Sequence, residues 1–522
     1  MSGTEGHRAL TAHQMVTRGD WLTPHLWDNV YLRKPPLQYW FIAILEVITG
    51  QTGTWIWRLP AVLCSALLGG IIVRFTSRHA GGIAGWCSGL AYVCLIPLWL
   101  QSRAADIDAA NTFFSVLGAL ALVELQDPNS SPRQNITRMA LVFLGTSATL
   151  MLKAQAAMPI IVAAWIGPWL MHRKINRKPW DWRLWAPILL GVLPLAIWMG
   201  MIYQQFQNQI HMADTRGLSE MANNVTGQIV DYFRALLLPV QLFAFSLPIS
   251  LCLMRFPNWL AKAHTPQTNA TTVCRNLFTT ILFATLIYVL TATHNPRYGY
   301  PILPLLCPIA GIMLKDWMTG QLNVTELNRF TKIIGIFLWS LVILHAVLAG
   351  MLIWQHGVQV LLILSVIIAF ISAVKSEIHL RRKQSGRSLI FLAVTLASLT
   401  IPISENLNFK KQRGGYMAAA ALIEETQTEP EQIVLARKVA YDQPELFYYA
   451  GRSTSALPRD IQTLLQTYTQ ATLVLHASEY DVMGESLAPY ITSKTTIDMH
   501  GKTRLWVVKI NAKQTTPALV RP

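Results

Sequence analysis

Charged residues are scarce in this chain. Of its 522 residues only 13% are Asp, Glu, Lys or Arg, whereas 52% are hydrophobic. Water-soluble domains of this total length would carry roughly twice that share of charge. The composition therefore excludes an assembly of ordinary soluble domains and indicates a polytopic membrane protein.

Acidic residues are scarcer than basic ones. The chain has 27 Asp and Glu against 43 Lys and Arg, and its formal net charge is +16. Most Lys and Arg lie in alternate loops between apolar segments, which is the pattern of loops retained in the cytoplasm. Contact with anionic membrane lipids explains much of the charge, so no nucleic-acid partner is needed to account for it.

Cysteine is also rare, with six residues that lie in or beside apolar segments and show no metal-ligand spacing. We interpret them as small core residues. The first residues, "MSGTEGHRAL", contain no apolar signal segment, although the charge pattern places them on the outer side. We therefore expect either that the following spans translocate this segment or that an apolar helix precedes Met1 in the native protein.

Long apolar segments are abundant. About twelve windows could cross a hydrocarbon core about 30 Å thick. The stretch 38–48 is shorter, carries Glu46, and is typical of an interfacial or re-entrant helix. The windows lie near residues 59–76, 81–100, 107–125, 137–152, 154–172, 184–203, 233–254, 276–293, 299–315, 331–353, 357–374 and 388–404.

The chain divides into three parts. Residues 1–58 are expected to form an outer-face loop with juxtamembrane helices, 59–404 a transmembrane domain, and 405–522 a soluble domain on the outer side. In the last part, expected strands at 432–439, 472–476 and 505–510 alternate with helices at 415–426 and 459–470, which predicts a small α/β unit. The expected fold class is thus a polytopic α-helical membrane protein of about twelve spans with a small C-terminal α/β domain.

Two outer-face segments offer groups for binding an anion. Tyr31 and Lys34 lie in "YLRKPPLQYW", where two prolines keep the backbone of Lys34 extended. An ammonium and a phenol hydroxyl suit a phosphodiester, and the alternative is a lysine that snorkels to lipid headgroups. In "THNPRYGYPILPLL", His294, Arg297 and Tyr298 precede a span; the guanidinium suits phosphate or carboxylate, and the alternative is an interfacial aromatic belt with an anchoring Arg.

Carboxylates and further cations lie on the same face. Asp106 and Asp108, in "RAADIDAANTFF", stand at the outer mouth of a span, where moving an acid into lipid costs several kcal/mol. The alternative for either is a helix N-cap. For Glu5 and Arg8 in "TEGHRAL", the alternative is that they belong to a solvated terminus. For Lys153, which lies between two apolar windows, the alternative is that its side chain snorkels to lipid headgroups.

Taken together, these segments resemble a known family. Glu5 with Arg8, "GDWLTPHLWDNVYLRKPPLQYW", "RLPAVL" from Arg58 onward, "DAANTFF", Lys153 and "RYGYPILPLL" are similar to the polyprenyl-phosphate-dependent GT-C glycosyltransferases. Within that superfamily the chain resembles aminoarabinose transferases that act on lipid A and protein O-mannosyltransferase-like enzymes. The resemblance covers about residues 1–320, and the rest of the chain mainly by layout.

The resemblance implies an inverting transfer of a sugar from an undecaprenyl-phosphate donor to a lipid or other envelope acceptor, on the periplasmic face of the inner membrane. It implies no cofactor beyond the lipid-linked sugar, and no spacing of ligands indicates a divalent metal. By resemblance, Tyr31, Lys34 and Arg297 hold the donor phosphate, Glu5 is the catalytic base and Asp108 is the second acid. Further substrate-binding candidates are Arg8, Arg58, Asp106, Lys153, His294 and Tyr298.

The chemistry of such a transfer agrees with these residue types. A hydroxyl that attacks an anomeric carbon needs a carboxylate to accept its proton, and a phosphate leaving group needs cations. A single displacement does not require the two carboxylates of a glycoside hydrolase. The alternative function is a transporter or flippase of a lipid-linked anion, but such a protein would need a polar path and paired half-helices. Few charges within the spans and no internal repeat favour the enzyme.

Overall fold

The computed structural model describes most of the chain before residue 382 and parts of the remainder. Seven helices in the described part are long and apolar enough to cross a membrane, or eight if one bent pair counts as a single span. The predicted fold class is confirmed, whereas the count of about twelve spans stays a prediction. The described residues are 5–26, 29–153, 158–206, 235–247, 249–250, 269–291, 296–319, 324–356, 360–382, 387–388, 390–392, 394–395, 398, 433–435, 454–456, 461–499 and 503–512.

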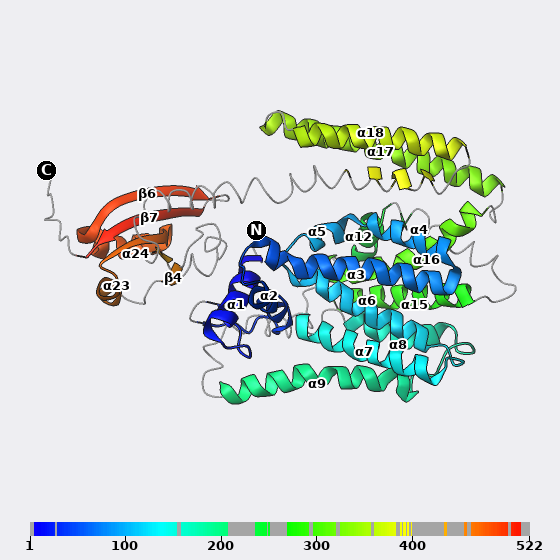
Figure 1. Cartoon of the computed structure of the whole chain (residues 1–522), viewed down its shortest axis with the longest axis horizontal. Helices are drawn as coiled ribbons and strands as arrows, with labels where there is room; N and C mark the ends of the chain where they lie inside the picture. Colours follow the sequence, from blue (N-terminus) through cyan, green and yellow to red (C-terminus); the bar gives the residue numbers. More distant parts are fainter. Residues whose placement is uncertain are drawn as a thin grey trace.

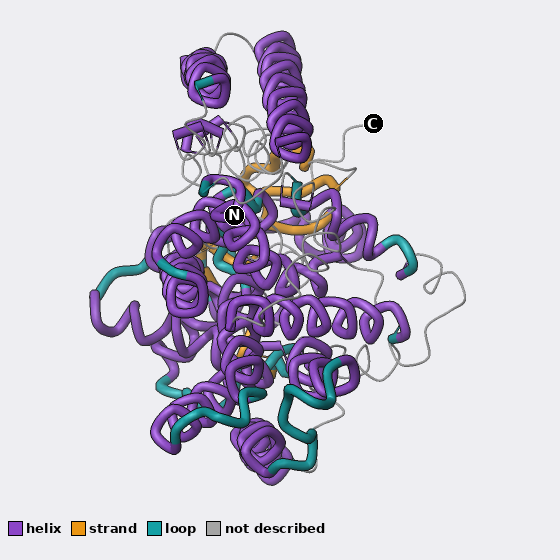
Figure 2. Tube along the Cα trace, turned by 90° about the vertical axis from the view of Figure 1, so that its right-hand side faces the viewer, coloured by secondary structure: helices purple, strands orange, loops and turns teal. Residues whose placement is uncertain are grey.

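The helices form an elongated bundle (Figure 1). In Figure 2, which looks nearly along that bundle, many helices are seen end-on, and α17 and α18 lie at the top in both views. The membrane-domain helices are α3 (Thr54–Ala80), α6 (Ile107–Leu125), α7 (Pro132–Lys153), α8 (Met158–Met171), α9 (Trp182–Gln205), α12 (Leu238–Phe245), α15 (Asn269–Leu290), the 3-10 helix η4 (Pro296–Ile302), α16 (Leu303–Met318), α17 (Val324–His356) and α18 (Val360–Arg381).

One predicted span is broken. Instead of one helix over 81–100, the chain forms α4 (Gly82–Val93) and α5 (Ile96–Ser102), which meet at 70°. Pro97 stands in the first turn of α5 and has no N–H to donate. Its ring would also clash with the carbonyl of Val93, four residues earlier, so α4 ends there. The short α5 then leads into the turn that carries Ala105 and Asp106.

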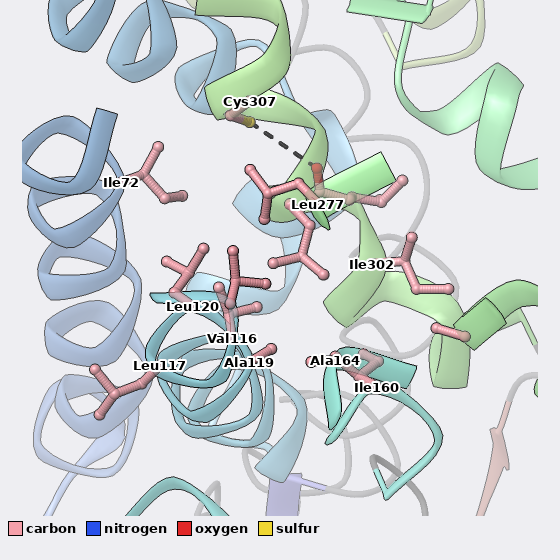
Figure 3. Packing of buried hydrophobic residues seen from close by; sticks show 14 of the residues in the cluster. Ile72, Val116, Leu117, Ala119, Leu120, Ile160, Ala164, Leu277, Ile302 and Cys307 are labelled. Carbon is pink, nitrogen blue, oxygen red and sulfur yellow. Dashed lines mark hydrogen bonds between the residues drawn. The ribbon is translucent and has the colours of Figure 1, made fainter. Parts of the chain in front are cut away.

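Helix α6 is the most deeply buried span, with 89% of its apolar window buried against 28% for α9. Its side chains pack against those of α3, α8, α15 and α16, as Figure 3 shows for Val116 and Leu120. Towards α7 the two backbones nearly touch. A Cβ added at Gly145 would lie 2.7 Å from the Cα of Gly118, so only glycine fits that position. Because of this burial and close packing, α6 is a central helix of the described bundle.

Two short helices precede the bundle. The first, α1 (Glu5–Arg18), is followed by a small hairpin of β1 (His25–Leu26) and β2 (Asn29–Val30), and then by α2 (Leu37–Thr49). Pro36 caps the start of α2, and Gly50 ends it in the left-handed conformation with φ 62°. Both helices lie at the end of the bundle where α3 begins (Figure 1). Since α2 has only 13 residues, it is too short for a full crossing.

The C-terminal part contains a mixed five-stranded sheet of order β4-β3-β5-β7-β6. The predicted strands correspond to β3, β5 and β7, but sequence reasoning missed β4, β6 and α24, and the predicted helix at 415–426 lies outside the described residues. The elements are β3 (Ile433–Leu435), β4 (Thr454–Ala456), α23 (Ile461–Thr467), β5 (Gln470–His476), α24 (Ala477–Leu487), η6 (Ala488–Tyr490), β6 (Ile491–Met499) and β7 (Thr503–Asn511).

The cysteines are placed as the sequence suggested, as far as the structure describes them. Five of the six are buried free thiols, and Cys252 lies outside the described residues. A role as small core residues is consistent with this burial.

Candidate active site

Glu5 is buried at the start of α1, with only 2% of its surface exposed. Arg58 of α3 donates two parallel hydrogen bonds to the carboxylate, from Nε to Oε1 at 2.9 Å and from Nη2 to Oε2 at 3.0 Å. The main-chain N–H of Ala105, just before α6, donates to Oε1 at 2.7 Å. The alternative of a solvated terminus is therefore wrong, and Glu5 joins α1 to two other parts of the bundle.

Arg8, one turn further along α1, is buried as well. Its Nη1 donates to the hydroxyl of Tyr39 at 3.0 Å, and its Nε lies 3.7 Å from Oδ1 of Asp106. Burial alone would lower the pKa of Arg8, but Tyr39, Tyr31 and Asp106 raise it above its ordinary value, so the guanidinium stays charged. For Tyr39, by contrast, burial raises the pKa, which keeps the phenol neutral.

Asp106 and Asp108 have different partners. Asp106 is the N-cap of α6, with Oδ1 accepting the N–H of Ile107 at 2.8 Å, as the alternative interpretation proposed. Asp108 lies in the first turn of α6 and accepts a hydrogen bond of 2.5 Å from Nζ of Lys153 at the end of α7. Only 12% of each side chain in this pair is exposed. Lys153 therefore contacts a buried carboxylate instead of snorkelling to lipid.

The helix η4 meets the same end of α6. The Lys153 Nζ lies 4.5 Å from the ring centre of Tyr298, a cation–π contact. Arg297 lies on the same helix, η4, which packs against α6. Arg297 is itself exposed. His294, predicted beside them, lies outside the described residues.

Tyr31 is 3% exposed, and its N–H donates to the carbonyl of Pro24 at 2.8 Å. The ring of His7, on α1 between Glu5 and Arg8, stacks against the Tyr31 ring at 6.0 Å between centroids. Lys34 follows three residues later, half-buried, directly before the two prolines that precede α2. The structure thus packs Tyr31 against α1, at the turn that carries Glu5 and Arg8.

Six of the predicted residues form a cluster in which carboxylates pair with cations. Three carboxylates, Glu5, Asp106 and Asp108, each lie beside one cation, and Arg58, Arg8 and Lys153 supply them in that order. Sequence reasoning missed two groups in this cluster. Tyr39 stands in an aromatic run that is also typical of a membrane interface, and the main-chain N–H of Ala105 has no sequence signature.

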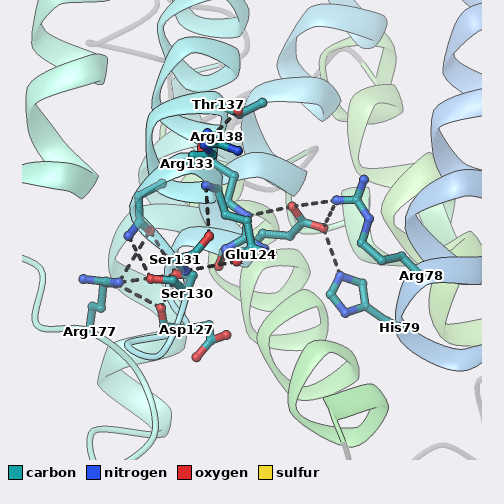
Figure 4. A network of polar contacts seen from close by, with 12 residues as sticks. Arg78, His79, Glu124, Asp127, Ser130, Ser131, Arg133, Thr137, Arg138 and Arg177 are labelled. Carbon is teal, nitrogen blue, oxygen red and sulfur yellow. Dashed lines mark hydrogen bonds and ion pairs between the residues drawn. The ribbon is translucent and has the colours of Figure 1, made fainter.

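A second polar cluster lies at the other end of α6 (Figure 4). Glu124 accepts hydrogen bonds from Arg138 Nε at 2.9 Å, His79 Nε2 at 3.0 Å and Arg78 Nη1 at 3.2 Å. These partners lie on α7 and α3, so Glu124 ties three spans together. It follows Asp108 by 16 positions, which is about 24 Å along a helix. Sequence reasoning missed this cluster, because a lone acid near the end of an apolar span gives no sign of its partners.

No group of three or more His, Cys, Asp and Glu side chains that could hold a metal ion occurs among the residues whose placement is described.

Comparisons with known proteins agree with this geometry. Residues 33–198, about a third of the chain, match the model of the dolichyl-phosphate-mannose-protein mannosyltransferase family. An undecaprenyl phosphate-alpha-4-amino-4-deoxy-L-arabinose arabinosyl transferase of Pseudomonas fluorescens (strain Pf0-1) is 25% identical over 198 residues, 36% of this chain and 33% of the relative. The corresponding transferase of Pseudomonas aeruginosa (strain LESB58) is 28% identical over 199 residues, 37% and 35%. The chain thus matches these relatives over about a third of their length.

Similarity of fold extends much further. The crystal structure of ArnT from Cupriavidus metallidurans bound to undecaprenyl phosphate superimposes with a TM-score of 0.69 over 100% of this chain and 95% of that one, at 15% identity. The chain has an ArnT-like GT-C fold. The apo form of the same ArnT gives a TM-score of 0.66 over 98% and 94%, again at 15% identity. Together with the family match and the curated relatives, this similarity confirms the resemblance to polyprenyl-phosphate-dependent GT-C glycosyltransferases, and activity has to be argued from the site.

Proposed function

We propose that this chain is an inverting glycosyltransferase that moves a sugar from an undecaprenyl-type phosphate donor to a lipid or other envelope acceptor. The observation that carries the proposal is the buried cluster at the outer end of α6, where carboxylates and cations from α1, α3, α6 and α7 meet. Two of the relatives act on undecaprenyl phosphate-linked aminoarabinose, which supports a lipid-linked sugar as the donor.

The pairing of charges supports separate roles for the residues that bind the phosphate and for those that support the site. Because each of the three carboxylates already has a cation beside it, these cations are largely neutralised for an incoming phosphate. Lys34, half-buried and three residues after Tyr31, and Arg297, exposed on η4, are the two cations that the family resemblance assigns to the phosphate. We assign the donor phosphate to these three residues, and the remaining predicted residues to the support of the site.

Glu5 is assigned as the base. In the proposed step, the hydroxyl oxygen of the acceptor forms a bond to the anomeric carbon while the bond from that carbon to the phosphate oxygen breaks. The hydroxyl proton passes to Glu5, and Lys34 and Arg297 stabilise the charge that the phosphate gains. Asp108 supports the site by holding Lys153, which in turn contacts Tyr298. Attack opposite the leaving group inverts the anomeric centre.

The direct test is transfer by the purified full-length protein in nanodiscs. Undecaprenyl phosphate carrying radiolabelled aminoarabinose would be supplied with lipid A, and labelled lipid A would be separated by chromatography. We expect labelled product from the wild type and almost none from Glu5→Gln. Movement of the donor between leaflets of proteoliposomes without any transfer would instead support the transporter, which no structural observation now favours.

We also propose that the protein spans the bacterial inner membrane with its site, residues 1–58 and residues 405–522 on the periplasmic side. A cysteine label tests this orientation, since all five described native cysteines are buried. In intact spheroplasts, Thr17→Cys on exposed α1 should react with an impermeant thiol reagent, whereas Lys174→Cys, exposed between α8 and α9, should react only after lysis. The reverse pattern would contradict the orientation and the periplasmic site.

A further inference from the structure

Arg58 differs from the other basic residues of the site in the way it is used. Its Nε and Nη2 atoms hold both oxygens of Glu5, at 2.9 and 3.0 Å, in the parallel geometry that suits a guanidinium and a carboxylate. The side chain of Glu5 is 3% exposed and that of Arg58 is 23% exposed. One of the two guanidinium edges that could hold a phosphate with two hydrogen bonds, the Nε–Nη2 edge, is therefore directed at a protein carboxylate.

The contacts to the Glu5 carboxylate connect separate parts of the fold. Arg58 lies in the first turns of α3, and the second donor to Glu5 is the main-chain N–H of Ala105, at the entrance of α6. The carboxylate is thus fixed by one rigid span and by the start of another. Such fixation matters for a base, because a displacement of about 1 Å from the productive geometry can cost about a hundredfold in rate.

We propose that Arg58 is a positioning residue that acts on sugar transfer through Glu5, and that it does not bind the donor or the acceptor. This inference rests on the proposed function, in which Glu5 is the base. It replaces the expectation from sequence that Arg58 binds substrate. A lysine at this position would keep the charge but could not hold two carboxylate oxygens at once.

A double-mutant cycle tests the inference. Transfer would be measured for the wild type, Arg58→Gln, Glu5→Gln and the double variant, with kcat and the KM for the lipid-linked sugar obtained separately. We expect Arg58→Gln to lower kcat about 10- to 100-fold, to leave the donor KM within about twofold, and to add less than about threefold to the loss in Glu5→Gln. Arg58→Lys should fall between the wild type and Arg58→Gln.

Two controls separate positioning from damage to the fold. Arg103→Gln makes the same change at an exposed arginine just beyond α5 and should leave kcat unchanged. Loss of Arg58 alone leaves a buried carboxylate without its guanidinium, so that variant could be unstable, whereas the double variant removes both charges together. Thermal unfolding of each variant, monitored in the same nanodiscs, gives the folded fraction by which the rates are normalised.

The results that would overturn the inference are distinct from those that would overturn the function. If losses in the cycle are additive, or if Arg58→Gln raises the donor KM tenfold with kcat unchanged, Arg58 binds substrate. If the wild type transfers no sugar, the proposed function fails and the inference falls with it. Transfer by the wild type together with an unchanged kcat in Arg58→Gln would refute the positioning role alone.

Discussion

The two ends of α6 use buried charge in different ways. At the C-terminal end, Glu124 receives donors from Arg78, His79 and Arg138, so one carboxylate is surrounded by nitrogen atoms of two neighbouring spans. At the N-terminal end, Asp106 pairs with Arg8 of α1 and Asp108 pairs with Lys153 of α7. One end gathers several donors around a single acid, and the other pairs separate acids with cations from separate helices.

This difference separates a structural cluster from a site. The cluster around Glu124 joins α3, α6 and α7 directly, because the described donors to Glu124 all lie on α3 and α7. The cluster at the N-terminal end of α6 includes Glu5 and Arg8 of the short helix α1 and the main-chain N–H of Ala105 in the turn before α6, held by side chains at the ends of α3 and α7. Parts that are positioned by a rigid scaffold without being its core are the usual carriers of function. Variants at the two ends should therefore change different measured quantities.

The largest effect is expected at Glu5. Glu5→Gln keeps the shape of the side chain but removes the basic group, so transfer should fall by about two to four orders of magnitude, the usual scale for loss of a general base. Donor binding should persist, because Lys34 and Arg297 are unchanged. Single-turnover transfer and equilibrium binding of the donor would be measured in parallel. Full transfer by this variant would move the role of base to Asp108.

The next largest effect is expected at Glu124, near the C-terminal end of α6. Glu124→Gln would leave Arg138 and its neighbours without a buried carboxylate, and breaking such a pair costs about 3–5 kcal/mol. We expect thermal unfolding at a clearly lower temperature, with an unchanged transfer rate per folded molecule. Glu485→Gln, the same change at an exposed acid of α24, is the matched control and should unfold like the wild type. A loss of transfer in fully folded Glu124→Gln would contradict a purely structural role.

A smaller loss is expected for the phosphate ligands. Lys34→Ala or Arg297→Ala removes one charge-assisted hydrogen bond, worth about 1.5–3 kcal/mol, so donor affinity should fall about 10- to 150-fold. Lys34→Arg should retain only part of the donor affinity, because a planar guanidinium differs in geometry from a compact ammonium. Titration with undecaprenyl phosphate measures the affinity directly. If both alanine variants bind as the wild type does, these residues only anchor the protein to lipid headgroups.

Local patterns in the sequence predicted more of the fold than of the site. The window 107–125 coincides with α6, because a mostly apolar run of 19 residues between an N-cap acid and a polar loop is long enough to cross the hydrocarbon core. The window 81–100 forms two helices that meet at 70° instead of one, because Pro97 cannot continue α4. At the site, residue types on one face were recognisable, but the pairing of Glu5 with Arg58 joins positions 53 residues apart. Such long-range pairing depends on how helices pack, which no local pattern specifies.

The smallest effect is expected far from α6, in the C-terminal sheet. Lys494 of β6 donates to the hydroxyl of Tyr480 at 3.0 Å, and its Nζ lies 4.5 Å from the ring centre of Trp506 on β7. Because Lys494 is exposed, Lys494→Ala should cost less than about 1 kcal/mol and leave transfer unchanged.

Limited proteolysis of the full chain, followed with an antibody against the C-terminal domain, would measure that small loss. Thr495→Ala, exposed on the same strand, is the matched control. If Lys494→Ala instead lowered transfer tenfold while proteolysis of the domain stayed the same, the lysine and its two aromatic neighbours would have to contact a substrate. The functional surface would then extend beyond the outer end of α6 to a second domain, and the contrast between the two ends of that helix would no longer be enough to locate it.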